Sequence, residues 1–158
     1  MTSNDAPDTA VTHEMMEQRY YHTIQPVLGD DAVTVVFVIS EKFCKYFAAA
    51  FQSLIDNSTR TRGYDIVIMH SDVTEKNMDI IRGMAPENFT VRFFNVNDTV
   101  KELFSRVNLK VRAYWDVSTY YRCFIPILMN DYRKVLYLDS DMIFNNIDGL
   151  FDMDFEGK

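Results

Sequence analysis

Short runs of β-branched and other apolar residues recur along the chain, separated by longer segments in which apolar positions repeat with a helical period. Nearly continuous apolar runs are typical of strands that are covered on both faces of a sheet, because neither face is then exposed to water. The runs predict four strands, at residues 33–39, 64–70, 90–96 and 134–138.

The segments between the runs predict helices. In the first segment the apolar residues fall at positions 43, 47, 51, 54 and 55, which form one stripe of a helix. Thr74 is predicted to cap a second, short helix that ends near Gly83, and a third helix is predicted to follow Asn97. The segment 115–131 predicts a fourth helix, interrupted at Pro126 because proline lacks the backbone donor.

Strands that alternate with helix-length segments imply right-handed β-α-β crossovers and parallel strand pairing. The predicted fold class is therefore α/β, with a mostly parallel, Rossmann-like sheet and flanking helices. Residues 1–31 lack this alternation and predict an N-terminal extension that is partly helical, whereas residues 32–158 predict the ligand-binding domain.

Composition and charge narrow the possible partners. The 158 residues are 47% hydrophobic, which suffices for the core of one domain, and 23 acidic against 16 basic side chains give a net charge of −7. No basic stripe is present, so nucleic acid is not an expected partner. No run approaches the roughly 18 apolar residues of a membrane span, and no signal-peptide pattern opens the chain, so we expect a cytoplasmic protein without a transmembrane segment.

Cys44 and Cys123 lie at no metal-binding spacing, and both are predicted to be reduced core residues.

Two carboxylates, Asp139 and Asp141, follow directly after the predicted strand 134–138. Ligands of open α/β sheets bind beyond the carboxyl ends of the strands, so this pair is in the expected place for a binding site. In an extended backbone, residues two apart point the same way, so the two carboxylates converge while Ser140 faces elsewhere. Because two anions repel each other, a divalent metal such as Mg²⁺ or Mn²⁺ would stabilise the pair.

Other functions of two close aspartates fit this sequence less well. An EF-hand loop is excluded because the positions that require a ligand and a glycine hold Ile143 and Phe144. A glycoside hydrolase needs carboxylates farther apart, about 5 to 9.5 Å. A phosphatase with an aspartate nucleophile would need a further base and metal ligand downstream, so it is kept only as a weaker alternative. By itself, an Asp-x-Asp is most often a solvated turn.

Longer stretches around the pair carry a family resemblance. The stretch "RCFIPILMNDYRKVLYLDSDMIFNNIDGLFDMD" at 122–154 resembles the family-8 glycosyltransferases, which are retaining enzymes with the GT-A fold. The blocks "VVFVISEKFCKYFAAAFQSLIDN" and "YDIVIMHSDVTEKN" look like the first two β-α units of that family. The resemblance extends from about residue 32 to residue 154, and several blocks in the right order are more specific than the Asp-x-Asp alone.

The resemblance implies roles for residues after the fourth predicted strand and in the helix before it. It implies that Asp139 and Asp141 hold Mn²⁺, or Mg²⁺, on the diphosphate of a UDP-sugar, with Ser140 beside them in the donor site. Arg122 matches an arginine that contacts the donor sugar region in the family. A guanidinium there could hold hydroxyl or phosphate oxygens with paired donors.

The loop after the first predicted strand departs from the family pattern. Family members usually have an acidic pair followed by Asn and Tyr around the uracil and ribose, whereas this chain has Ser40, Glu41, Lys42 and Phe43. By resemblance, Ser40, Glu41 and Phe43 are assigned to the donor site. Phe43 can stack on a base as an alternative to opening the core stripe of its helix, but the contacts that select the base are expected to differ.

The resemblance implies a metal-dependent retaining glycosyltransferase that transfers a hexose from UDP-galactose or UDP-glucose to a glycan acceptor, as in lipopolysaccharide biosynthesis. Its location would be cytoplasmic or peripheral at the inner membrane face. In the family the acceptor-binding half follows the Asp-x-Asp by many tens of residues, whereas this sequence ends 17 residues after Asp141. The hypothesis is therefore a truncated domain that binds donor with little transfer, and that self-associates through exposed surface. The alternative is a non-catalytic nucleotide-sugar-binding or assembly module.

Two smaller features receive structural interpretations. His70 is predicted to be a hydrogen-bonded structural residue at the end of its strand. The acidic turn that contains Asp148, Asp152 and Asp154 is predicted to be solvated surface.

Overall fold

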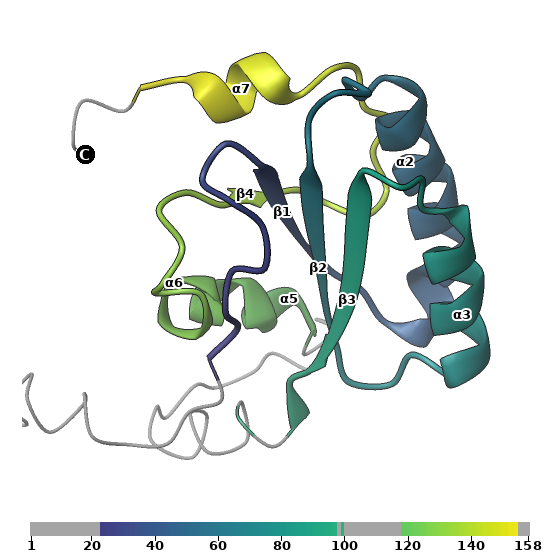
Figure 1. Cartoon of the computed structure of the whole chain (residues 1–158). Coiled ribbons are helices and arrows are strands. Elements are labelled where there is room, and N and C mark those ends of the chain that lie inside the picture. Colours follow the sequence, from purple (N-terminus) through teal and green to yellow (C-terminus); the bar gives the residue numbers. More distant parts are fainter. Residues whose placement is uncertain (1–22, 98, 100–117, 155–158) are drawn as a thin grey trace, which may run out of the picture.

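A four-stranded parallel sheet forms the centre of the protein (Figure 1). The structure is a computed structural model that describes residues 23–97, 99 and 118–154. The strands are β1 (Val33–Val38), β2 (Tyr64–His70), β3 (Phe89–Asn95) and β4 (Leu136–Tyr137), in the order β3-β2-β1-β4. Every pair is parallel, with Val36 of β1 opposite Val67 on one side and Tyr137 on the other. The predicted α/β fold class is confirmed.

Three strands agree with the prediction to within one residue at each end, but β4 does not. It has two residues, where the apolar run predicted a strand over 134–138. Lys134 instead directs its Nζ toward the backbone oxygens of Phe151 and Met153, 2.7 Å from each. Beyond the strand, the backbone N–H of Leu138 still donates to the carbonyl of Val36 at 3.1 Å, so the edge contact with β1 continues toward the aspartate pair.

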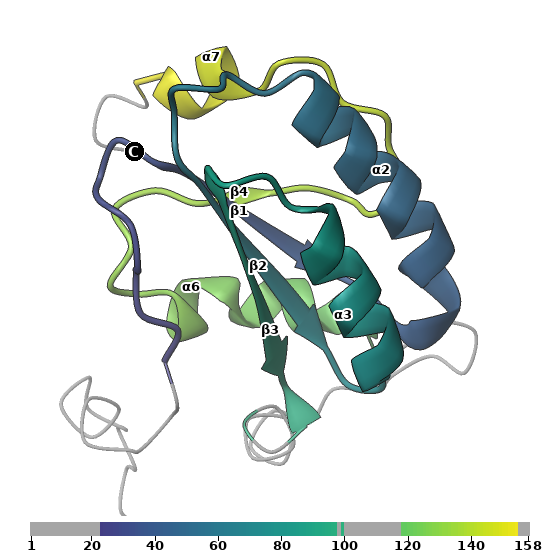
Figure 2. The same ribbon diagram turned by 45° about the vertical axis from the view of Figure 1, so that its right-hand side comes forward.

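One face of the sheet is covered by α2 (Cys44–Asp56) and α3 (Glu75–Met84), which lie side by side in both views (Figures 1 and 2). A 3-10 turn, η1 (Glu41–Phe43), leads from β1 into α2. The predicted stripe of α2 is buried at Phe47, Phe51 and Leu54, against the sheet, because these positions repeat with the helical period.

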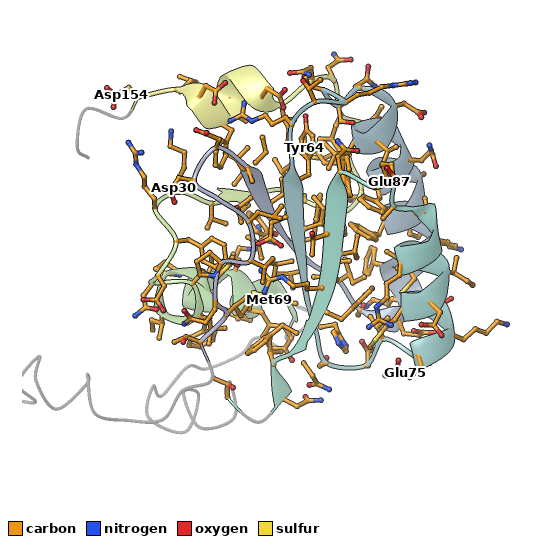
Figure 3. All side chains as sticks on the ribbon, viewed as in Figure 1. Asp30, Tyr64, Met69, Glu75, Glu87 and Asp154 are labelled. Atoms are coloured by element: carbon orange, nitrogen blue, oxygen red, sulfur yellow. The ribbon has the colours of Figure 1, made fainter. Side chains whose placement is uncertain are left out.

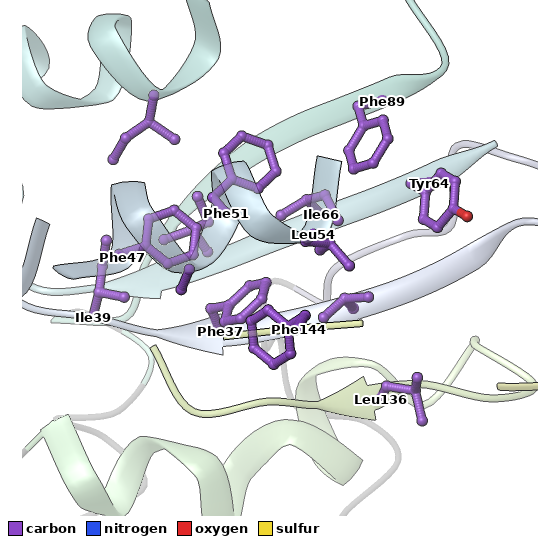
Figure 4. Close-up of a cluster of buried hydrophobic side chains, with 14 of the residues drawn as sticks. Phe37, Ile39, Phe47, Phe51, Leu54, Tyr64, Ile66, Phe89, Leu136 and Phe144 are labelled. Carbon is purple, nitrogen blue, oxygen red and sulfur yellow. The ribbon is translucent and has the colours of Figure 1, made fainter. Parts of the chain in front are cut away.

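The core on this face is rich in aromatic side chains (Figure 4). Phe37 of β1 meets Phe47 edge-on, with ring centroids 4.9 Å apart, and Phe47 stacks on Phe51 at 5.6 Å. Phe144, which follows the aspartate pair, packs against Phe37 at 6.0 Å. Burial of one such side chain stabilises the fold by about 2 kcal/mol. Phe144 therefore anchors the segment that leaves β4.

The other face is covered by short helical pieces, namely α5 (Ser118–Tyr121), η2 (Arg122–Phe124) and α6 (Ile125–Leu128). Pro126 lies in the first turn of α6, and the helical segment changes to a 3-10 turn just before it, which agrees with the predicted interruption. The helix predicted after Asn97 lies outside the described residues.

Residues 23–31 run along this second face. Ile24 is buried with the cluster beneath α6, and its backbone N–H donates to the carbonyl of Leu128 at 2.7 Å. Residues before 23 lie outside the described part, so the boundary between an extension and a domain at residue 31 remains a prediction.

A last helix, α7 (Asp148–Asp152), lies across the amino ends of the strands (Figure 1). Asp152 and Asp154 are exposed, as predicted for solvated surface, whereas Asp148 is half-buried. Asp148 accepts a hydrogen bond from the hydroxyl of Tyr64 at 2.7 Å, and Asp152 pairs with both terminal nitrogens of Arg62. Figure 3 shows Tyr64 at this end of β2 and Met69 toward the other. The acidic helix is therefore fastened to the sheet, opposite the strands' carboxyl ends.

The two cysteines have different environments. Both are free thiols, and Cys44 is buried as predicted. Cys123 is exposed, so its assignment to the core is wrong. Its neighbour Phe124 is buried in the second cluster and occupies the inward position of that turn.

In the part of the chain that the structure describes, no helix has both the length and the apolar character needed to cross a lipid bilayer.

Candidate functional site

The carboxyl ends of β1 and β4 meet at one edge of the sheet. The order β3-β2-β1-β4 places β2 and β4 on opposite sides of β1, so the chain reverses its direction of travel across the sheet there. Such a switch point leaves a crevice between the loops that leave the two strands, and ligands of α/β proteins bind in it. The predicted site residues Ser40–Phe43 and Asp139–Asp141 belong to these two loops.

A surface cleft of about 490 Å³ lies at this edge. Its lining consists of Lys42, Phe43, Lys45, Tyr46 and Asp141. The structure thus brings Asp141, a predicted metal ligand, to the same cleft as Phe43, a predicted donor contact. The two residues are 98 positions apart in the sequence, and only the sheet topology joins them.

Aromatic rings and ammonium groups alternate along the wall of this cleft. The rings of Phe43 and Tyr46 have centroids 5.9 Å apart. The Nζ of Lys42 lies 5.2 Å from the Phe43 ring centroid, and that of Lys45 lies 4.9 Å from the Tyr46 centroid. Lys45 and Tyr46 were not predicted as site residues. Their helical spacing from Lys42, three and four residues on, was the available signal.

The other predicted metal ligand, Asp139, has two neighbours. The Tyr137 hydroxyl donates to its Oδ1 at 2.7 Å, and Nη1 of Arg122 lies 3.4 Å from the same oxygen. The Arg122 guanidinium lies over the Tyr137 ring, 4.7 Å from the centroid. Burial raises the pKa of Tyr137 above its usual value, and its hydrogen bond to Asp139 adds to that effect. The hydroxyl therefore stays a donor at neutral pH.

Tyr137 was not predicted as a site residue, although its position offered a signal. It lies two residues before Asp139, and side chains two apart on an extended strand point to the same side. Arg122 was predicted, and the structure brings it to Asp139 from a different element, η2.

The donor set of the aspartate pair suits a hard divalent cation. Asp139 and Asp141 are both exposed, so their oxygens are accessible, and carboxylate oxygens are preferred ligands of Mg²⁺ and Mn²⁺. Within residues 23–97, 99 and 118–154, no group of three or more His, Cys, Asp or Glu side chains is arranged to hold a metal. A cation here would thus rely on two protein carboxylates together with oxygens from a bound ligand and water.

Glu41 lies in the loop after β1, but its carboxylate is turned to α3. One oxygen accepts the backbone N–H of Thr74 at 2.8 Å, and the other accepts the Asn77 amide at 2.7 Å. The backbone N–H of Glu41 donates to Asp72 at 3.0 Å. The bond from Thr74 is the main reason that the pKa of Glu41 is lowered. Thr74 caps α3 by position as predicted, but Glu41 supplies the capping oxygen.

Ser40 places a buried hydroxyl at the end of β1. The residue is 5% exposed, and its Oγ forms no hydrogen bond with the described residues. Buried polar groups nearly always have a partner, so this hydroxyl is available to a bound ligand or to water.

His70, at the carboxyl end of β2, has a structural role. Its Nδ1 accepts the backbone N–H of Val73 at 3.3 Å, and its ring meets Phe93 edge-on. Burial lowers the pKa of His70, so the neutral acceptor form is favoured. This agrees with the prediction of a hydrogen-bonded structural histidine.

A family model and a solved structure that match this chain are both of glycosyltransferases. The family model for glycosyl transferase family 8 matches residues 34–158. Among solved structures, the apo WbbM bifunctional glycosyltransferase is similar with a TM-score of 0.69 and 31% identity, over 84% of this chain and 22% of that one. No curated protein sequence matches the chain.

Two further solved structures share the fold at lower identity. The galactosyltransferase LgtC, in complex with donor and acceptor sugar analogs, has a TM-score of 0.57 and 23% identity, over 77% of this chain and 43% of that one. Mouse xyloside xylosyltransferase 1 has a TM-score of 0.61 and 15% identity, over 77% of this chain and 47% of that one. The chain thus spans less than half the length of each of these proteins.

Proposed function

We propose, from the premise that the chain belongs to glycosyl transferase family 8, that the crevice beyond β1 and β4 binds the nucleotide-sugar donor of a glycosyl transfer reaction. One observation carries the proposal. Asp141 lines a cleft whose other residues are two aromatic and two cationic side chains. A nucleoside diphosphate offers a flat base and an anionic diphosphate, and this lining complements both.

Each part of the donor has a candidate partner. Phe43 and Tyr46 offer ring faces on which a base can stack, and stacking tolerates different bases. Lys42 and Lys45 supply positive charge next to those rings. The buried Ser40 hydroxyl, which has no described hydrogen-bond partner, supports a ligand contact at the end of β1.

Asp139 and Asp141 are the residues that would hold a divalent cation, Mn²⁺ or Mg²⁺. A bound cation would stabilise the negative charge that develops on the departing nucleoside diphosphate. Arg122, beside Asp139, would donate paired N–H groups to oxygens of the diphosphate or of the sugar. These roles follow from the accessible carboxylates and from the guanidinium that the structure places beside one of them.

The substrate in this proposal is a UDP-hexose, UDP-galactose or UDP-glucose, and the acceptor is a glycan. Support comes from the similar galactosyltransferase LgtC, whose structure contains donor and acceptor sugar analogs. Retention of the anomeric configuration belongs to the same proposal. The family match gives no support to the alternative of an aspartate-based phosphatase.

A second candidate, a non-catalytic nucleotide-sugar-binding module, is favoured by one observation. Glu41, at the position of the family's acidic pair, is engaged with α3 and not turned to the cleft. Incubation with UDP-glucose, UDP-galactose and Mn²⁺ separates the two candidates. Release of UDP supports an enzyme, whereas tight donor binding without any release supports the module.

Calorimetric titration of UDP, with and without Mn²⁺, tests the donor site. We expect binding that depends on Mn²⁺ and that weakens about tenfold or more in Asp141→Asn, because one of two carboxylate ligands is lost. Asp30→Asn is the matched control, since Asp30 is an exposed aspartate that precedes β1 at the other end of the sheet. A wild-type chain that binds UDP equally well without metal, or does not bind it, contradicts the proposal.

A further inference from the structure

Arg122 and Asp139 form an ion pair within the candidate metal site. Their closest atoms, Nη1 and Oδ1, are 3.4 Å apart, and the side chains are 41% and 50% exposed. Tyr137 contacts both partners, because its hydroxyl donates to Oδ1 of Asp139 and its ring lies beneath the guanidinium. One carboxylate oxygen is therefore shared between a tyrosine hydroxyl and a positive charge.

A divalent cation on Asp139 would come close to this guanidinium. Two positive charges that share one carboxylate repel each other, and the effective dielectric constant near a protein surface is well below that of water. A metal that binds alone must therefore weaken the contact between Arg122 and Asp139 or bind less tightly. The repulsion is relieved if an anion gives the guanidinium another partner.

We infer that Arg122 is the resident counter-cation of Asp139, that it competes with the metal for this carboxylate, and that it transfers to the donor's diphosphate when metal and nucleotide bind together. The inference rests on the proposed function. Because of Arg122, the site binds the metal weakly when the metal is alone and tightly when nucleotide is also bound. The coupling is reciprocal, so metal and nucleotide strengthen each other's binding by the same factor.

Tyr137 can support Arg122 both when it pairs with Asp139 and when it pairs with the donor's diphosphate. A guanidinium stacks on an aromatic face with a broad range of orientations, so Arg122 can exchange one oxygen partner for another while it remains over the ring. The Tyr137 hydroxyl keeps Asp139 oriented when the guanidinium leaves. Tyr137 is thus a positioning residue that acts on both partners.

Two titrations of Arg122→Gln test the inference because they are expected to change in opposite directions. Mn²⁺ alone, followed by the electron paramagnetic resonance signal of free Mn²⁺, should bind about two- to fivefold more tightly, since a competing charge is removed. UDP in the presence of saturating Mn²⁺ should bind about tenfold more weakly, since charged hydrogen bonds to the diphosphate are lost.

Two further variants separate charge from structure. Arg122→Lys keeps the positive charge, so its affinity for Mn²⁺ alone should stay near that of the wild type. If the glutamine variant does not fold, Arg122→Met, which also removes the charge, takes its place in both titrations. Arg60→Gln removes the same charge from an exposed position between α2 and β2, at the other end of the sheet, and should alter neither titration.

The possible failures are distinguishable. If Arg122→Gln weakens both titrations or leaves the affinity for Mn²⁺ alone unchanged, the competition is wrong while the donor site stands. If Arg122→Lys binds Mn²⁺ as tightly as the glutamine variant, the charge is not responsible, and the inference is again wrong. If the wild-type chain binds neither Mn²⁺ nor UDP, both this inference and the proposed function are contradicted.

Discussion

Glu41 connects the candidate site to the neighbouring β-α loop. Its backbone N–H and carboxylate contact Asp72, Thr74 and Asn77, all in or near the turn that starts α3. Glu41 also starts the 3-10 turn that presents Lys42 and Phe43 to the cleft. We therefore infer that Glu41 positions the wall of the cleft, whereas its predicted direct contact with the donor remains a prediction.

Replacement of Glu41 by alanine distinguishes these roles. If Glu41 positions the turn, Glu41→Ala should lower the melting temperature and also weaken UDP binding about three- to fivefold, as expected for lost hydrogen bonds. Glu87→Ala, at an exposed glutamate in the loop before β3, is the control and should change neither quantity. Weaker UDP binding at an unchanged melting temperature would instead indicate direct contact with the donor.

At the scale of single residues, the sequence predicted where the site residues lie better than it predicted which residues they contact. Asp139, Asp141 and Phe43 were predicted from their places after strands and from the family resemblance, and the structure places them at one edge of the sheet. The partners of Glu41 were not predictable because they lie more than 30 residues away. The role of Tyr137 was hidden because an apolar strand already explains a tyrosine at that position.

Two arginine–aspartate pairs join elements of the fold, and they differ in burial. Asp65 of β2 is 1% exposed and receives two hydrogen bonds from Arg92 of β3. The hydroxyl of Tyr132 donates to the same carboxylate at 3.0 Å. Just before the amino end of β2, Arg62 donates two similar hydrogen bonds to the exposed Asp152. The buried pair fixes adjacent strands, whereas the exposed pair fixes only α7.

This difference predicts unequal effects of the same substitution. Asp65→Asn should lower the free energy of unfolding by about 3 kcal/mol, because Arg92 loses its counter-charge at a largely buried position. Asp152→Asn should have a much smaller effect, because water and salt already screen the exposed pair. Chemical denaturation of both variants measures the difference. Equal losses would show that burial does not determine the strength of these pairs.

β1 and β2 are buried along nearly their whole length, and their apolar runs predicted them to within one residue. β3 was predicted equally well from its apolar residues, although most of the strand is only half-buried. β4 was predicted too long because it lies at the edge of the described sheet, where Lys134 reaches the end of α7 and does not extend the strand. Pro126 marked the helix break correctly, because its missing backbone donor acts locally.

For the whole molecule, the strand order places Asp139 and Asp141 beside the loop that follows β1. The pattern predicted parallel strands but not their order, and the order β3-β2-β1-β4 brings the loops after β1 and β4 together. The acidic helix α7 lies at the other end of the strands, where it is fastened through Tyr64 and Arg62. The pair Asp139 and Asp141 and the helix α7 therefore lie at opposite ends of the strands, and we assign metal-dependent donor binding to the pair.

Paramagnetic broadening of backbone amide signals by Mn²⁺, in the presence of UDP, tests this assignment most directly, with Mg²⁺ as the diamagnetic reference. We expect the signals of Ser40, Phe43 and Asp141 to broaden at low Mn²⁺ concentration, while those of Gly63 and Asp148 remain sharp. Broadening centred on Gly63 and Asp148, or spread evenly over the chain, would contradict it.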